Sequence, residues 1–320
     1  MKLPPNPDNW EKTILEKLLL ETLVEQRRAR RWGIFFRLLS FTFLLFIAGA
    51  FFSGNIREVS SLESHTALVD LKGVITTDSK ASADKIISAL RQAFKNKHTK
   101  GVVLRINSPG GSPVQAGYIN DEIRRLRAKY PDIPLHVAVQ DICASGGYYV
   151  AVAADRIFVD KASIVGSIGV LMDGFGFTGT MDKLGVERRL ITAGENKGFL
   201  DPFSPLNPEQ QKYAKQMVDE IHQQFIKVVK QGRGKRLKEI PEMFSGLVWS
   251  GERSVELGLA DGLGNLDSIA RDIIKAEQIV DFTPEESFPE LLAHRLGAKA
   301  GEGFWKSMTL GSTRDSSTLN

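Results

Sequence analysis

The sequence GVVLRINSPGGS, residues 101–112, joins an apolar run to a proline-glycine turn, and LHVAVQDICASGG, residues 135–147, leads another apolar run into paired glycines. Both apolar runs have the length and composition of strands. Helix-forming sequence follows each turn, at 113–128 and at 146–154. Strands that alternate with helices in this way are typical of α/β layers. The two segments therefore predict an α/β fold.

The same alternation continues on both sides of these segments. Further strands are predicted at 67–71 and 156–159, and further helices at 83–94, 207–230 and 267–276. The sequence Asn207-Pro208-Glu209 is typical of a helix start, because asparagine caps helices well and proline suits their first turn. A short helix is expected at 181–184, which Gly185 ends.

An apolar segment precedes this body. Residues 32–52 are apolar apart from Arg37, Ser40 and Thr42, and as a helix they would reach about 31 Å, enough to cross a hydrocarbon core. Four arginines lie just before the segment, at positions 27, 28, 30 and 31. By the positive-inside rule, the N-terminus is expected in the cytoplasm and the rest of the chain outside it.

Two other interpretations of this segment stay open. Ala48-Gly49-Ala50 is similar to a signal-peptidase cleavage site, and an apolar helix can also be buried in a core. Residues 10–23 are expected to form a short amphipathic helix. The predicted organisation is a cytoplasmic segment, a transmembrane anchor, a linker, a folded α/β domain and a polar, disordered tail, with bounds 1–31, 32–53, 54–66, 67–296 and 297–320.

Composition excludes several classes of function. The net charge is +4 and the pI about 9.0, but the basic residues are not gathered into a nucleic-acid footprint. A single cysteine allows no internal disulfide. No pattern of metal ligands is present. We therefore expect no metal, no cofactor and no nucleic-acid partner.

The two glycine turns carry the residues suited to chemistry. Ser145 follows a strand and opens a helix, where its hydroxyl is well placed to attack a carbonyl group. The N–H groups of Gly111 and Gly146 could stabilise the oxyanion that forms, with Gly110 as an alternative donor. The competing interpretation is that both turns only pack tightly in an α/β sheet.

Three motifs together resemble the signal peptide peptidase A family, in its short, single-anchor form. They are residues 107–111 (NSPGG), 144–149 (ASGGYY) and 166–169 (GSIG). The resemblance covers about 67–276 and implies a Clp/crotonase-like fold of repeated β-β-α units with a helical C-terminal part. It also implies a Ser-Lys dyad. Ser145 is then the nucleophile, Lys197 in residues 194–199 (GENKGF) the general base, and Ser167 the hydroxyl that orients the lysine. A lysine base must be neutral, so burial has to lower its pKa from about 10.4.

The resemblance further implies a ring-shaped homo-oligomer with Ser and Lys contributed across a subunit boundary. The implied substrates are extended peptides, above all cleaved signal peptides in the membrane. The implied location is the bacterial inner membrane, with the catalytic domain on the extracytoplasmic side. Two alternatives stay open: a quality-control or regulatory protease acting on membrane or misfolded exported proteins, and a non-catalytic membrane scaffold.

Other motifs fit less well. Residues 174–179 (GFGFTG) match a dinucleotide fingerprint, but only a short helix can follow them. Cys143 ends an apolar strand and is expected to be a small buried hydrophobe. His136 and His222 lie in strand and helix patterns, so we expect packed or surface positions for both.

Overall fold

The computed structural model describes residues 10–53 and 63–284 of the chain. The chain divides into two units, Met1–Glu58 with Glu285–Asn320, and Val59–Pro284. Most of the predicted linker and the whole predicted tail lie outside the described residues.

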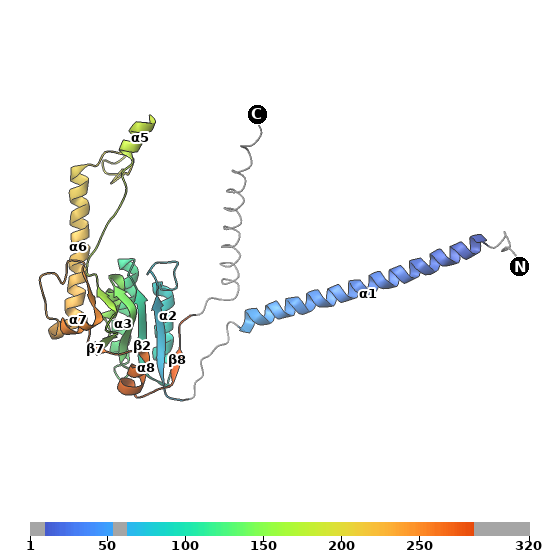
Figure 1. Ribbon diagram of the computed structural model, residues 1–320, viewed down its shortest axis with the longest axis horizontal. Coiled ribbons are helices and arrows are strands. Elements are labelled where there is room, and N and C mark those ends of the chain that lie inside the picture. Colours follow the sequence, from blue (N-terminus) through green and yellow to red (C-terminus); the bar gives the residue numbers. More distant parts are fainter. Residues whose placement is uncertain (1–9, 54–62, 285–320) are drawn as a thin grey trace, which may run out of the picture. The chain divides into compact units, whose positions relative to one another are not determined.

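The described residues of the first unit form one continuous helix, α1, Trp10–Ser53 (Figure 1). The prediction of a separate short helix at 10–23 was wrong, since neither proline nor glycine interrupts the sequence between Leu23 and Trp32. Among the residues whose side chains are described, no helix is long and apolar enough to cross a membrane. The predicted transmembrane helix at 32–53 is therefore not supported. The side chains at 47, 48 and 50–53 lie outside the described part.

The second unit is built on a mainly parallel sheet with the order β6-β5-β3-β2-β1-β8. Its three long strands are β1, His65–Lys72, β2, Thr99–Ser108, and β3, Leu135–Ala144, all parallel. They coincide with the predicted apolar runs, and their near-continuous burial is typical of parallel strands covered on both faces. The α/β prediction is confirmed.

Short strands complete the sheet. They are β4, Arg156–Val159; β5, Ile164–Gly166; β6, Val248–Ser250; β7, Gly262–Leu263; and β8, Ile279–Asp281. β6 pairs antiparallel with β5, and the other pairings are parallel. β3 changes partner along its length, from β4 at residues 136–138 to β5 at 142–144. This change brings the end of β5 beside the end of β3.

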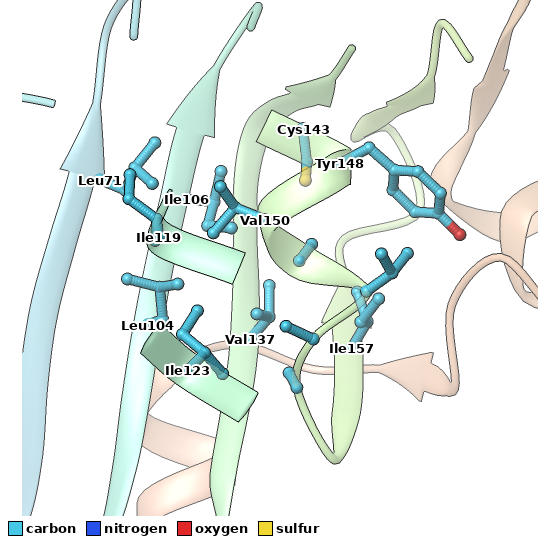
Figure 2. Packing of buried hydrophobic residues seen from close by; sticks show 14 of the residues in the cluster. Leu71, Leu104, Ile106, Ile119, Ile123, Val137, Cys143, Tyr148, Val150 and Ile157 are labelled. Carbon is cyan, nitrogen blue, oxygen red and sulfur yellow. The ribbon is translucent and has the colours of Figure 1, made fainter. Parts of the chain in front are cut away.

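Three helices pack on the sheet through apolar faces. They are α2, Ala83–Lys95; α3, Pro113–Lys129; and α4, Gly146–Ala151. Figure 2 shows side chains of α3 and α4, such as Ile119, Ile123 and Val150, meeting those of β2 and β3. Each fully buried Leu, Ile or Val side chain stabilises the fold by about 1.5–3 kcal/mol. The core thereby holds the helix starts against the carboxyl ends of β2 and β3.

The helix α6, Pro208–Arg233, begins as predicted, with the Asn207 side chain accepting hydrogen bonds from the N–H groups of Glu209 and Gln210. Its second half packs on the core through Phe225, Val229 and Arg233, but Ala214 is the one buried residue before Phe225. Figure 1 shows the start of α6 projecting away from the sheet.

The segment before α6, residues 170–206, is here called the arm. It contains the short helix α5, Thr178–Leu184, at the far end of α6 from the sheet (Figure 1). None of its residues is buried, and Leu171, Phe175 and Ile191 are 80%, 79% and 96% exposed. The arm folds on itself through stacked rings of Phe177 and Phe203, whose centroids are 5.4 Å apart.

After α6 the chain forms short helical turns. These are η1, Gly234–Arg236; α7, Gly251–Glu256; α8, Leu266–Ser268; and the π-helical η2, Ile269–Ile274. The predicted helix at 267–276 corresponds to α8 and η2 together, which end at Lys275 in a left-handed conformation. Arg233 is fully buried and donates to both carboxylate oxygens of Asp261 at 2.8 and 2.9 Å, which ties α6 to this part of the chain.

Candidate active site

The two glycine turns lie against each other at the carboxyl edge of the sheet. A β-carbon added at Gly110 would lie 2.7 Å from the Gly146 nitrogen and 2.7 Å from the Ser145 β-carbon. Real β-carbons essentially never approach other atoms so closely, so only glycine allows this approach. β2 and β3 are parallel neighbours, and their carboxyl ends therefore present both turns at one place.

Ser145 occupies a strained backbone conformation at the start of α4, with φ 51° and ψ −122°. A non-glycine residue with positive φ costs roughly 1–3 kcal/mol and is held only by its surroundings. Here the Ser145 N–H donates to the Gly166 carbonyl at 2.9 Å, and the Ser145 carbonyl accepts from Tyr149 N–H at 2.9 Å. These bonds fix the serine between β5 and α4, at a sharp turn suited to a nucleophile.

Two N–H groups beside Ser145 are free to bind an anion. Among the described residues, neither Gly111 N–H nor Gly146 N–H donates a hydrogen bond, and the Gly111 nitrogen lies 3.3 Å from where a β-carbon of Gly146 would be. Gly111 has φ +145°, and a β-carbon there would lie 2.3 Å from the Ile75 carbonyl oxygen. In contrast to Gly111, Gly110 donates its N–H to Ser108 Oγ at 3.2 Å. The geometry favours Gly111 and Gly146 as the oxyanion donors.

Ser167 lies next to Ser145 through the pairing of β5 with β3. Ala144 is the register partner of Gly166, so the two serines follow paired residues on adjacent strands. Ser167 also has positive φ, 50°, and its N–H donates to the Leu247 carbonyl at 2.8 Å. The structure thus brings Ser167 together with Ser145, Gly110, Gly111 and Gly146, which are all but one of the predicted site residues.

Lys197 lies elsewhere, exposed in a turn of the arm. Its loop is tied to the start of α6, where Leu200 N–H donates to Gln210 Oε1 at 3.0 Å. The Ser145 helix is instead packed at the other end of α6, where the rings of Tyr149 and Phe225 lie 5.2 Å apart. Fifteen residues of helix separate Gln210 from Phe225, about 22 Å at 1.5 Å per residue. Within one chain, the two predicted dyad members do not meet.

Two residues near the serines were not predicted to contribute. The His222 ring lies 3.1 Å from the Ile168 carbonyl through Nε2, so it holds the loop that follows Ser167. Trp249 on β6 packs against Gly166, and its indole nitrogen is buried without a hydrogen-bond partner in the described structure. No local sequence signal could have found them, because both approach the site only through the packing of α6 and β6.

Two other residues, Cys143 as a nucleophile and His136 as a base, are unsuited to catalysis. Cys143 is fully buried, and burial raises the pKa of its thiol far above the ordinary range. His136 is buried in β3, where burial lowers its pKa. Among the described residues, no group of three or more His, Cys, Asp and Glu side chains could hold a metal ion. Residues 174–179 run into the start of α5 and no strand leads directly into them, unlike a dinucleotide site.

A comparison with known protein families finds a match. The description of peptidase family S49 matches residues 127–280, a range that contains Ser145, Gly146, Ser167 and Lys197, whereas Gly110 and Gly111 lie before it.

Three relatives extend the match. The protein MJ0651 of Methanocaldococcus jannaschii, whose name describes a protease, is 33% identical over 69% of this chain and 68% of its own length. An Enterococcus faecium protein, whose name describes a signal peptide peptidase SppA, is 31% identical over 62% of this chain and 57% of its own length. A Brucella melitensis protein named Na(+)/H(+) antiporter NhaA is 43% identical over 67% of this chain. The aligned part spans only 30% of that protein's own length.

The identity with MJ0651 covers more than two thirds of both chains, and the S49 description includes four of the predicted site residues. The S49 match and the relatives whose names describe peptidases support a serine-type endopeptidase. The chain belongs to peptidase family S49.

Proposed function

We propose that this chain is a membrane-attached serine endopeptidase in which Ser145 attacks the substrate and Lys197 of a neighbouring copy acts as its base. The observation that carries the proposal is the strained Ser145 turn packed against two free N–H groups. A backbone strained at a serine beside unpaired donors is costly for the fold and useful for acyl transfer.

The reaction follows from these groups. The Ser145 oxygen bonds to the peptide carbonyl carbon while its proton passes to the neutral Lys197 amine, and the Gly111 and Gly146 N–H groups stabilise the oxyanion. The carbon–nitrogen bond then breaks, and the leaving amine takes the proton from Lys197. Water, deprotonated by the same lysine, hydrolyses the acyl-enzyme and restores Ser145.

A base from a neighbouring copy accounts for the position of Lys197. The arm holds Lys197 about 22 Å along α6 from the Ser145 helix, and Lys197 is exposed. A lysine base needs burial to favour its neutral form, and a second copy docking on the arm would supply it. The arm's exposed apolar side chains, such as Phe175 and Ile191, suit a protein interface. Head-to-tail contacts of this kind form a ring when the rotation between neighbouring copies closes.

The proposed substrates are extended peptides with apolar side chains, in particular signal peptides left in a membrane after cleavage. The name of the Enterococcus relative supports this substrate class. The helix α1 supports attachment to the membrane, because its described residues from Leu38 to Phe46 expose large apolar side chains. The arginines before Trp32 favour a cytoplasmic N-terminus, with the protease unit on the other side of a bacterial inner membrane.

The test is complementation between two inactive variants. Ser145→Ala and Lys197→Ala are purified singly and after co-expression, as full chains in nonionic detergent, and assayed on a synthetic signal peptide. Each variant alone should be inactive. In mixed assemblies roughly a quarter of the sites should pair an intact serine with a neighbour's intact lysine, and activity should return in that proportion.

The matched control co-expresses Ser145→Ala with the double variant Ser145→Ala/Lys197→Ala, which supplies lysines but no serine and should stay inactive. Activity of Lys197→Ala alone would refute the lysine as base. Mixed assemblies that form but stay inactive would refute the contribution from a neighbouring copy. A fluorophosphonate that labels wild type but not Ser145→Ala would exclude the scaffold alternative.

A further inference from the structure

The helix α1 carries four arginines on one exposed face. Arg27, Arg28, Arg30 and Arg31 fall within an arc of about 160° around the helix, at about 100° per residue. All four are exposed, and no ion pair involving them is found among the described residues. Arginine stays charged at any physiological pH. The face therefore presents a concentrated positive charge that the described fold does not neutralise.

An aromatic cluster follows this face directly. The Trp32 ring lies 5.7 Å from those of both Phe35 and Phe36, which are 5.6 Å from each other. Tryptophan prefers the headgroup level of a bilayer, where its apolar ring contacts lipid and its N–H group contacts water. Beyond it the helix exposes large apolar side chains up to Phe46, which is 73% exposed.

The continuity of the helix fixes the spacing of these three regions. No break separates the arginine face from Trp32 or Trp32 from Phe46, so at 1.5 Å per residue the four arginine positions lie within about 8 Å of Trp32 along the axis. When Trp32 lies at headgroup level, the arginines lie at the depth of the phosphate groups. Arginine binds phosphate oxygens with two parallel hydrogen bonds.

We infer that the face formed by Arg27, Arg28, Arg30 and Arg31 binds the headgroup phosphates of anionic phospholipids. This inference rests on the proposed membrane attachment and extends it from an apolar anchor to a choice of lipid. A zwitterionic headgroup carries its own ammonium group and offers the arginines no net charge, so the site distinguishes anionic from zwitterionic lipid. The lipid would thereby fix the depth of the helix in the membrane.

The test uses the fluorescence of Trp32. The full chain is placed in mixed micelles of nonionic detergent with phosphatidylglycerol or phosphatidylcholine whose acyl chains are brominated, and so quench a nearby indole. Subtracting the signal of Trp32→Phe removes the other tryptophans. At low salt, half-maximal quenching by brominated phosphatidylglycerol should need a mole fraction about tenfold lower than by brominated phosphatidylcholine. About 1 M salt should remove the difference.

The test variant replaces all four arginines by glutamine, and its quenching by the two lipids should be equal. The matched control removes the same charge from exposed lysines of the other unit, replacing Lys72, Lys95, Lys97 and Lys100 by glutamine, and should keep the wild-type preference.

Equal quenching of wild type by both lipids, or a preference kept by the arginine variant, would overturn the inference and leave an acidic protein segment as the partner. Quenching by neither lipid would overturn the membrane attachment and the inference with it. Signal peptide hydrolysis by the same samples reports on the protease separately.

Discussion

Gly110→Ala tests whether the contact between the two glycine turns builds the site. The new methyl group would lie 2.7 Å from both the Gly146 nitrogen and the Ser145 β-carbon, and 3.0 Å from the Ala144 carbonyl oxygen. All three atoms belong to the turn that carries the nucleophile, so that turn must move. Gly110 also has φ +105°, which alanine adopts only with strain.

The magnitude follows from these two costs. A strained φ costs roughly 1–3 kcal/mol, and forcing an extra carbon into packed structure costs a further 1–3 kcal/mol or so. We expect the free energy of unfolding to fall by about 2–6 kcal/mol. Displacing the Gly146 N–H from the oxyanion should also lower kcat by roughly 10²–10³ in the variant that stays folded.

The assay combines urea unfolding of the full chain in detergent with hydrolysis of a signal peptide. Gly117→Ala is the matched control, because Gly117 lies in α3 just beyond the same turn and a β-carbon there meets nothing within 4 Å. It should gain up to about 1 kcal/mol of stability from better helix propensity and keep full activity. Wild-type stability and kcat in Gly110→Ala would show that the two turns do not depend on each other.

Three further predictions concern the rest of the protease unit. Arg233→Met should cost about 3–5 kcal/mol of unfolding free energy, because it leaves the Asp261 carboxylate without its buried partner. As a control in the same urea titration, Arg253→Met removes an exposed ion pair and should cost under about 1 kcal/mol. Burial opposes a lower pKa of Asp261, but hydrogen bonds and charge from Arg233 outweigh burial, so this pKa is lowered. The ionised Asp261 therefore stabilises the fold fully above the unfolded carboxyl pKa of about 3.9, and this stabilisation is lost as the pH falls through the lower folded pKa. Asp261→Asn should weaken the dependence of the unfolding free energy on pH in this acid range, and an unchanged dependence would contradict the role given to Asp261. Cys143 should resist a maleimide in the folded chain and react on unfolding in urea, since burial raises the pKa of its thiol, and rapid labelling of the native protein would contradict its burial.

The local patterns of the chain were sufficient for its principal elements. β1, β2, β3, α2 and α3 lie where the apolar runs and helical periodicities predict them. The start of α6 was also predicted, because a capping asparagine and a proline act within one turn. The three-residue strands β5, β6 and β8 were not predicted, since so short a segment becomes a strand only through pairing with neighbours distant in sequence.

In the candidate site, too, some features could be predicted from the sequence and others could not. Ser145 could be proposed from sequence because its turn, strand and helix are contiguous. The contact of Gly110 with Ser145, the strained φ of both serines and the contacts of His222 and Trp249 could not be proposed, since they depend on the order and register of the strands. The roles of these residues in catalysis stay predictions.

By itself the sequence determined which segments become strands and helices and which turns carry reactive groups, because those preferences arise from side-chain periodicity and backbone sterics within a few residues. Only the tertiary structure decided that β3 exchanges β4 for β5, which places Ser167 beside Ser145. It also decided that α6 holds the Lys197 loop away from the serine of its own chain. The physical reason is that a rigid helix packed only at its second half keeps its first half at a fixed distance from the core, whatever its sequence favours locally.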